Sequence, residues 1–220
     1  MKGAGIPPGA FPRESDMSTA RDLLIVALDV PSGRPVEQGD LSLALAGAEL
    51  VDLMDAEAVR LDDERIVPGL QPATGDRLLD AAGAALARQA PYESVEDWLW
   101  RRGRGLAAAY ADDLEERGRA AGGERHHWLP WRGGDEGAPA DSPERRHATD
   151  RWASREPVLV GLAAALGIPE GAPEQAPEDL PGDATVTVLA AVNGALTELE
   201  AVRQRRRIEK DAFDNVWRAP

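Results

Sequence analysis

Residues 40–55 read DLSLALAGAELVDLMD, and this stretch decides the fold class. Its apolar residues recur at helical spacing and form a broad apolar side, which predicts a helix from about Asp40 to Asp55. The preceding segment, with Ser18 and Thr19 as an N-cap, predicts a helix through Leu28. The segment after it predicts a short β-hairpin over residues 58–67 with its turn at residues 62–64.

Capping residues and apolar periodicity predict six further helices. They are one capped by Thr74 that runs through Leu86, one capped by Ser94, one over residues 104–117 ended by Gly118, one that starts at Ser142–Pro143, one over 158–166 and one over 184–211. A second strand-like run, residues 126–131, predicts another hairpin. The expected fold is mainly α, a single globular helical domain over residues 18–220 with two short β-hairpins. The Gly- and Pro-rich residues 1–17 predict a disordered tail.

The composition excludes several classes of protein. The 220 residues include 25 Lys and Arg against 39 Asp and Glu, which gives a net charge of −14. A protein that coats DNA or RNA needs a dominant basic surface, so no nucleic-acid partner is expected. The absence of cysteine excludes disulfides and thiolate chemistry. No run approaches the roughly 20 apolar residues of a membrane span, so any membrane contact is expected to be peripheral.

No catalytic constellation emerges from the sequence. The phosphate-binding loop, the HExxH helix and the GxSxG elbow are all absent. The three histidines do not form a ligand pattern, because the adjacent His126 and His127 would point to opposite faces of a strand. We therefore expect a protein that is not an enzyme and that uses no metal or cofactor.

Two groups of residues suggest a binding surface. Arg101, Arg102 and Arg104 surround Gly103 just before a predicted helix N-terminus, a setting that suits phosphate. The alternative is that these arginines form salt bridges with the acidic N-terminal half of the chain. Trp128 and Trp131, in the second predicted hairpin, suit either a bilayer interface or packing of the hairpin onto the helices.

The order of motifs resembles the Golgi phosphoprotein 3-like family, in its bacterial branch. The resemblance covers roughly Thr19 to Asn193 and rests on the order of the set rather than on a single diagnostic motif. The motifs are ARDLLIVAL (20–28), GRP (33–35), LALAGAELVDL (43–53), TGDRLLD (74–80), VEDW (95–98) and LEERG (114–118). It implies a helical domain with a protruding β-hairpin. Eukaryotic members bind phosphatidylinositol 4-phosphate at the Golgi and retain glycosyltransferases there.

The resemblance also implies which residues bind the lipid headgroup. The family's pocket positions fall on Glu37, Ala46, Arg104 and Ala107, and Arg104 alone keeps a cation, with Arg101 and Arg102 beside it. The family hairpin that contacts the bilayer or other subunits maps to about residues 125–140. Its contact residues here are Trp128, Leu129, Trp131 and Arg132.

The expected function is thus a non-enzymatic, cytoplasmic protein attached peripherally to the inner face of the membrane through an anionic, phosphoinositide-like phospholipid. A protein partner and a homo-oligomer formed through the hairpin are also expected. The alternative is a cytosolic protein–protein adaptor that has lost the lipid pocket and binds through the acidic face around residues 37–63.

Overall fold

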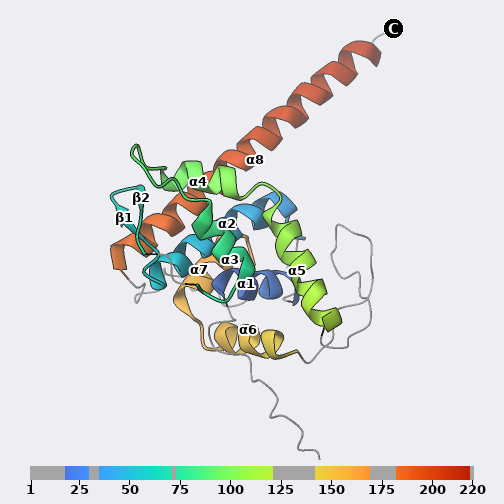
Figure 1. The fold of residues 1–220 in the computed structure, drawn as a ribbon. Coiled ribbons are helices and arrows are strands. Elements are labelled where there is room, and N and C mark those ends of the chain that lie inside the picture. The colour runs from blue at the N-terminus through green and yellow to red at the C-terminus, as the bar shows by residue number, and fades with distance from the viewer. Residues whose placement is uncertain (1–17, 30–34, 71–72, 121–141, 169–181, 219–220) are drawn as a thin grey trace, which may run out of the picture.

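A computed structural model describes residues 18–29, 35–70, 73–120, 142–168 and 182–218. In these ranges the chain is mainly helical, with one two-stranded antiparallel hairpin (Figure 1). The elements are α1 (Thr19–Asp29), α2 (Gln38–Asp55), β1 (Val59–Asp62), β2 (Arg65–Pro68), α3 (Arg77–Ala84), α4 (Val95–Arg102), α5 (Leu106–Ala120), α6 (Pro143–Ala153), α7 (Pro157–Ala165) and α8 (Gly182–Arg218). The predicted fold class is confirmed.

Helix α2 lies at the centre of the core. It contacts α1, α3, α4, α5, α7 and α8, and most of its side chains are buried, which explains its broad apolar side in the sequence. Gly47 allows the close approach of α8, because a Cβ atom there would lie 2.4 Å from Val192 Cγ2. The long apolar stretch thus forms the helix around which the others pack.

The first predicted hairpin is confirmed. β1 pairs with β2 from Val59 opposite Pro68 to Asp62 opposite Arg65. Asp63 supplies the turn with a φ of 51°, a conformation that Asp tolerates better than most residues. The second predicted hairpin and the predicted tail lie outside the described residues.

Boundaries of three predicted helices are wrong, and the first of them, α3, also ends at Ala84 and not at the predicted Leu86. Asp76, not Thr74, caps α3, because its carboxylate accepts the Leu78 and Leu79 N–H groups, while Thr74 bonds to Asp80. Helix α5 begins at Leu106 and continues past Gly118, because glycine inside a helix costs only about 1 kcal/mol and does not force an end.

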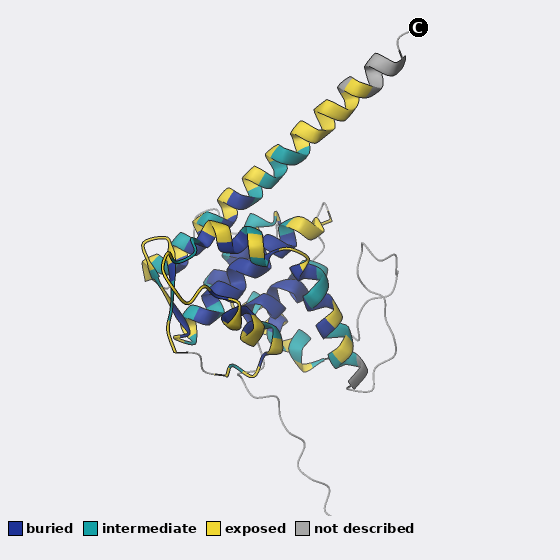
Figure 2. Ribbon diagram, turned by 45° about the horizontal axis from the view of Figure 1, so that its top comes forward, coloured by how far each residue is buried: buried dark blue, intermediate teal, exposed yellow. Residues whose placement is uncertain are grey.

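The third of these helices is α8, which continues beyond the predicted Asp211 to Arg218. Its first half, residues 182–200, packs on the body, where Val188, Val192 and Ala195 are buried. Its second half projects from the body as an exposed rod (Figures 1 and 2).

By length and composition alone, Gly182–Asp211 is long and apolar enough to cross a membrane. No such segment is expected from the sequence. The first half of α8 packs on α2, α4 and α7 along one side, and its other side is exposed.

Candidate functional site

The corner between α4 and α5 carries the arginine trio that the sequence singled out. Ser94 caps α4 as predicted, since its Oγ accepts the Asp97 N–H at 3.0 Å. Gly103 fits tightly, because a Cβ atom there would lie 2.6 Å from the Leu99 carbonyl oxygen. Gly105 has a φ of 70°, a conformation that favours glycine. These residues fix the corner's backbone and hence where the arginines emerge.

Arg101 and Arg102 are both engaged with carboxylates inside the molecule. Arg101 donates from Nε and Nη2 to Glu93 at 2.6 and 2.7 Å, and its guanidinium lies 5.2 Å from the centroid of the Trp98 ring. Arg102 donates in the same bidentate way to Glu49, at 2.7 Å for both contacts. For Arg102, salt bridging to the acidic N-terminal half, the alternative interpretation of the sequence, is what the structure has.

Arg104 differs from its two neighbours. Its side chain is exposed, and it makes no hydrogen bond or ion pair with any other described residue. Within the trio it is therefore the guanidinium that can bind an external anion without first breaking an internal pair.

The other implied pocket positions do not join Arg104 in a cationic site. Ala46 and Ala107 are fully buried, and the Ala107 N–H donates to Ser42 Oγ at 3.1 Å. Glu37 is exposed at the N-cap of α2. The start of α5 is also partly used internally, because the Leu106 N–H donates to the Gly103 carbonyl at 3.3 Å. Phosphate binding here would thus depend on the Arg104 side chain more than on helix N–H groups.

The predicted hairpin contacts Trp128, Leu129, Trp131 and Arg132 lie outside the described residues, so the structure does not relate them to Arg104. Among the described residues, no group of three or more His, Asp and Glu side chains is placed to hold a metal. His147 contacts Asp22 Oδ1 through Nδ1 at 3.1 Å.

The acidic N-terminal segment is less of a surface than the sequence indicated. Asp22 is buried and accepts Arg151 Nη1 at 2.7 Å, and Glu49 is buried against Arg102 and Tyr110. These acids stabilise the packing of α1, α2, α4, α5 and α6 instead of facing a partner.

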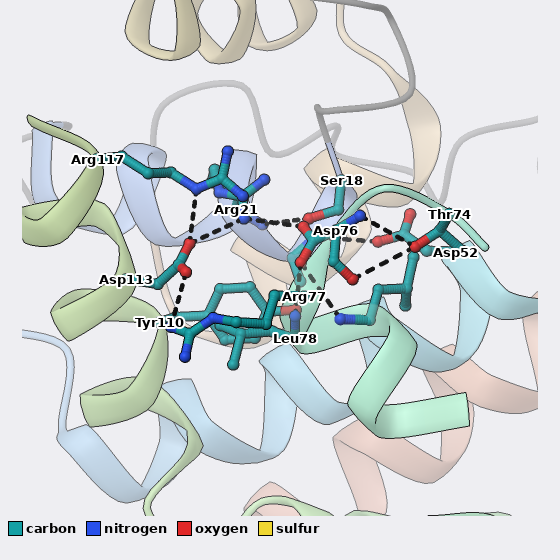
Figure 3. Close-up of polar contacts among 12 residues, drawn as sticks. Ser18, Arg21, Asp52, Thr74, Asp76, Arg77, Leu78, Tyr110, Asp113 and Arg117 are labelled. Carbon is teal, nitrogen blue, oxygen red and sulfur yellow. Dashed lines mark hydrogen bonds and ion pairs between the residues drawn. The ribbon is translucent and has the colours of Figure 1, made fainter. Parts of the chain in front are cut away.

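Sequence reasoning missed a buried charge cluster between α1, α3 and α5 (Figure 3). Arg21, with 1% of its side chain exposed, contacts Asp76 Oδ2 at 2.9 Å and Asp113 Oδ2 at 3.1 Å. Arg77 and Arg117 also donate to Asp113, at 3.0 and 2.9 Å. Burial alone would raise the pKa of Asp113, but the hydrogen bond from Arg77 and the charges of Arg117 and Arg21 hold it below its ordinary value. The signal for this cluster in the sequence was the adjacent pair of charged residues, Arg21 and Asp22, inside the otherwise apolar helix α1.

Asp52 should make stability depend on pH. It accepts the Thr19 and Ala20 N–H groups at 3.1 and 3.3 Å, and burial raises its pKa from 3.8 to about 7 in spite of these bonds. Because the folded state then holds the proton more tightly than the unfolded chain, the stability contributed by protonated Asp52 is lost as the pH rises from the ordinary carboxylate range through about 7.

The unfolding free energy of the wild type should fall between about pH 5 and about pH 8. In Asp52→Asn this fall should be smaller by about 1–3 kcal/mol. Urea unfolding at the two pH values measures this difference. Asp63→Asn, at the exposed hairpin turn, is the matched control and should leave the pH dependence as in the wild type. Equal pH dependence in wild type and Asp52→Asn would contradict the prediction.

The element order defines a mainly helical domain in which α4 and α5 meet at the corner that carries Arg104. The family model described as Golgi phosphoprotein 3 (GPP34) matches residues 20–209. The chain therefore belongs to the Golgi phosphoprotein 3 family, and the resemblance in its motifs is confirmed. No curated protein and no solved structure matches the chain.

Proposed function

We propose that this protein is a non-enzymatic peripheral membrane protein of the cytoplasmic side that binds an anionic phospholipid headgroup at the α4–α5 corner. The observation that carries the proposal is the exposed Arg104, which has no partner among the described residues and lies on a corner with a fixed backbone. Family membership supports it at the level of a Golgi phosphoprotein 3-like protein.

The three arginines have unequal parts in this proposal. Arg104 contacts the headgroup phosphate directly. Arg101, whose side chain is 44% exposed, offers its solvent side while remaining bonded to Glu93, and Arg102 mainly holds the corner to α2 through Glu49. Since one cation near an anionic surface contributes about 1 kcal/mol, attachment through this corner alone is weak. The indole and arginine side chains of Trp128, Trp131 and Arg132, together with Leu129, supply the second membrane contact.

Replacing Arg104 by alanine should weaken binding to anionic vesicles about fivefold, the equivalent of about 1 kcal/mol. Co-sedimentation with phosphatidylcholine vesicles, with and without phosphatidylglycerol or phosphatidylinositol 4-phosphate, measures this. Arg60→Ala removes the same charge from an exposed position on β1 and is the matched control, expected to bind as the wild type does. Equal pelleting with neutral and anionic vesicles, or an unaltered Arg104→Ala variant, would overturn the proposal.

The second candidate function is a cytosolic protein–protein adaptor. The observation that favours it is the internal pairing of Arg101 and Arg102, which leaves little cationic surface at the corner. Its partner would meet the acids that remain exposed near the first hairpin, such as Asp62, Asp63 and Glu64. Capture of a protein partner without binding to any vesicle would favour this function, and loss of capture in Asp63→Arg would assign the surface.

A further inference from the structure

Helix α8 carries most of the large apolar side chains that the described part of the chain exposes. Four such side chains are exposed, and Val186, Ile208 and Phe213 lie on α8, with exposed fractions of 45%, 69% and 63%. Val186 lies on the half that packs on the body, and the other two lie on the projecting half. One helix therefore presents apolar surface at both ends.

The packed half of α8 borders a groove of about 550 Å³, which it forms with the start of α4 and the hairpin turn. Small residues form one wall, among them Ala191, Gly194 and Ala195. A Cβ atom added at Gly194 would meet nothing within 4 Å, so this wall has room for a side chain from outside. The carboxylates of Glu64, Glu96 and Glu198 also line the groove and make it acidic.

The face of α8 that lines the groove continues along the projecting half. Positions 191, 194, 198, 201, 205 and 208 alternate three and four residues apart, the spacing that keeps side chains on one seam between paired helices. Glu198 and Arg205 on this seam are exposed and have no hydrogen-bond or ion-pair partner among the described residues. The projecting half carries acids such as Glu209 and Asp211 beside Arg206 and Lys210, so the charge complementarity rests on Arg205 and Glu198.

We propose that a second copy of this chain occupies the groove, with the two α8 helices paired antiparallel about a two-fold axis near Ala201. Arg205 then lies opposite the partner's Glu198, and Ile208 enters the partner's groove beside the partner's Gly194. The same contacts repeat on the other side of the axis, as a two-fold interface requires. An in-register parallel pair would place Glu198 against the partner's Glu198 and Arg205 against the partner's Arg205, and like charges oppose that arrangement.

The dimensions of α8 allow this arrangement. At about 1.5 Å per residue, Ile208 lies about 21 Å along the helix from Gly194, so each projecting half runs alongside the packed half of the partner's α8. Ala201 and Ile208 on the seam are thereby covered, and Arg205 faces the partner's Glu198 at the acidic groove. This dimer is independent of the proposed lipid contact, because it uses no residue of the α4–α5 corner.

Charge reversal tests the pairing and its direction. Light scattering during size-exclusion chromatography should give the wild type twice the 23.5 kDa mass of one chain. Glu198→Arg alone and Arg205→Glu alone should each be monomeric at that concentration, since every interface pair becomes a like-charge pair. An equimolar mixture of the two variants should regain the dimer mass, because both pairs across the axis are then opposite in charge. Gly194→Leu, which fills the groove without touching its own core, should also be monomeric.

Each contrary result overturns the proposal. A wild type that stays monomeric up to its solubility limit shows that no second copy binds. Single reversals that remain dimeric place the interface elsewhere, as would be the case for a dimer formed through residues 125–140. Monomeric single variants whose mixture does not dimerise contradict the antiparallel register. Circular dichroism of each variant, with helix content as in the wild type, shows that lost mass is lost pairing and not unfolding.

Discussion

Arg21→Ala is expected to lower the free energy of unfolding by about 3–5 kcal/mol, because it leaves two buried carboxylates without their shared cation. Arg21 contacts Asp76 and Asp113 at 2.9 and 3.1 Å, and all three side chains are almost completely buried. Asp76 also caps α3 and Asp113 belongs to α5, so this one guanidinium joins α1 to two other helices. Removing it leaves the buried Asp76 carboxylate without its ion-pair partner, whereas Asp113 keeps Arg77 and Arg117.

The matched control for Arg21→Ala is Arg77→Ala. Arg77 donates to the same Asp113 carboxylate at 3.0 Å, but its side chain is 67% exposed. Water replaces a lost partner at such a site, and we expect a cost within about 1 kcal/mol. Urea unfolding followed by circular dichroism compares the two variants. If Arg21→Ala proves as stable as Arg77→Ala, the buried cluster does not stabilise the fold in the way argued here.

The helices could be predicted from the sequence because their signals are local. Apolar spacing predicts α2, and short capping patterns predict α4 and α6, whose caps Ser94 and Ser142 accept N–H groups as expected. The wrong boundaries arise where two local signals compete. Thr74 and Asp76 are both good caps, and the structure uses Asp76, whose carboxylate also meets Arg21.

The charge partners could not be predicted, because they depend on contacts between distant parts of the chain. Arg102 pairs with Glu49 across 53 residues, and Arg21 pairs with Asp113 across 92 residues. In the sequence, Arg101, Arg102 and Arg104 are three equivalent cations beside a glycine. Only the fold distinguishes the exposed Arg104 from two arginines that already have carboxylate partners.

The proposed dimer raises the affinity of the proposed lipid contact for a membrane. A single Arg104 corner binds an anionic surface weakly, on the order of 1 kcal/mol. A dimer carries two such corners, and where both reach one membrane the second contact forms at a high effective concentration. Glu198→Arg should then reduce vesicle binding although it adds positive charge and residue 198 lies on α8, not on the corner, and the equimolar mixture with Arg205→Glu should restore it.

Trp98→Ala is expected to cost about 3–5 kcal/mol of unfolding free energy, the usual range for removing a large aromatic side chain from a core. Trp98 is fully buried, and its Nε1–H donates to the Ala46 carbonyl at 3.0 Å. This hydrogen bond links α4 to the centre of α2. The Trp98 ring also contacts the Arg101 guanidinium. The cavity left by alanine would be bordered by α2, which packs against most of the other helices.

Two further variants separate the packing of Trp98 from its hydrogen bond. Trp98→Phe keeps much of the apolar volume but removes the indole donor to Ala46, whose carbonyl keeps its helical partner within α2, for an expected cost of about 0.5–1.5 kcal/mol. Trp100→Ala changes the same residue type at the edge of the core, where the side chain is only partly buried, and should cost less than Trp98→Ala. Urea unfolding ranks the three variants. Because Trp98 positions the α4–α5 corner, a folded Trp98→Phe variant should also bind anionic vesicles more weakly than the wild type. A folded variant that binds as the wild type does would show that the corner is held without this hydrogen bond.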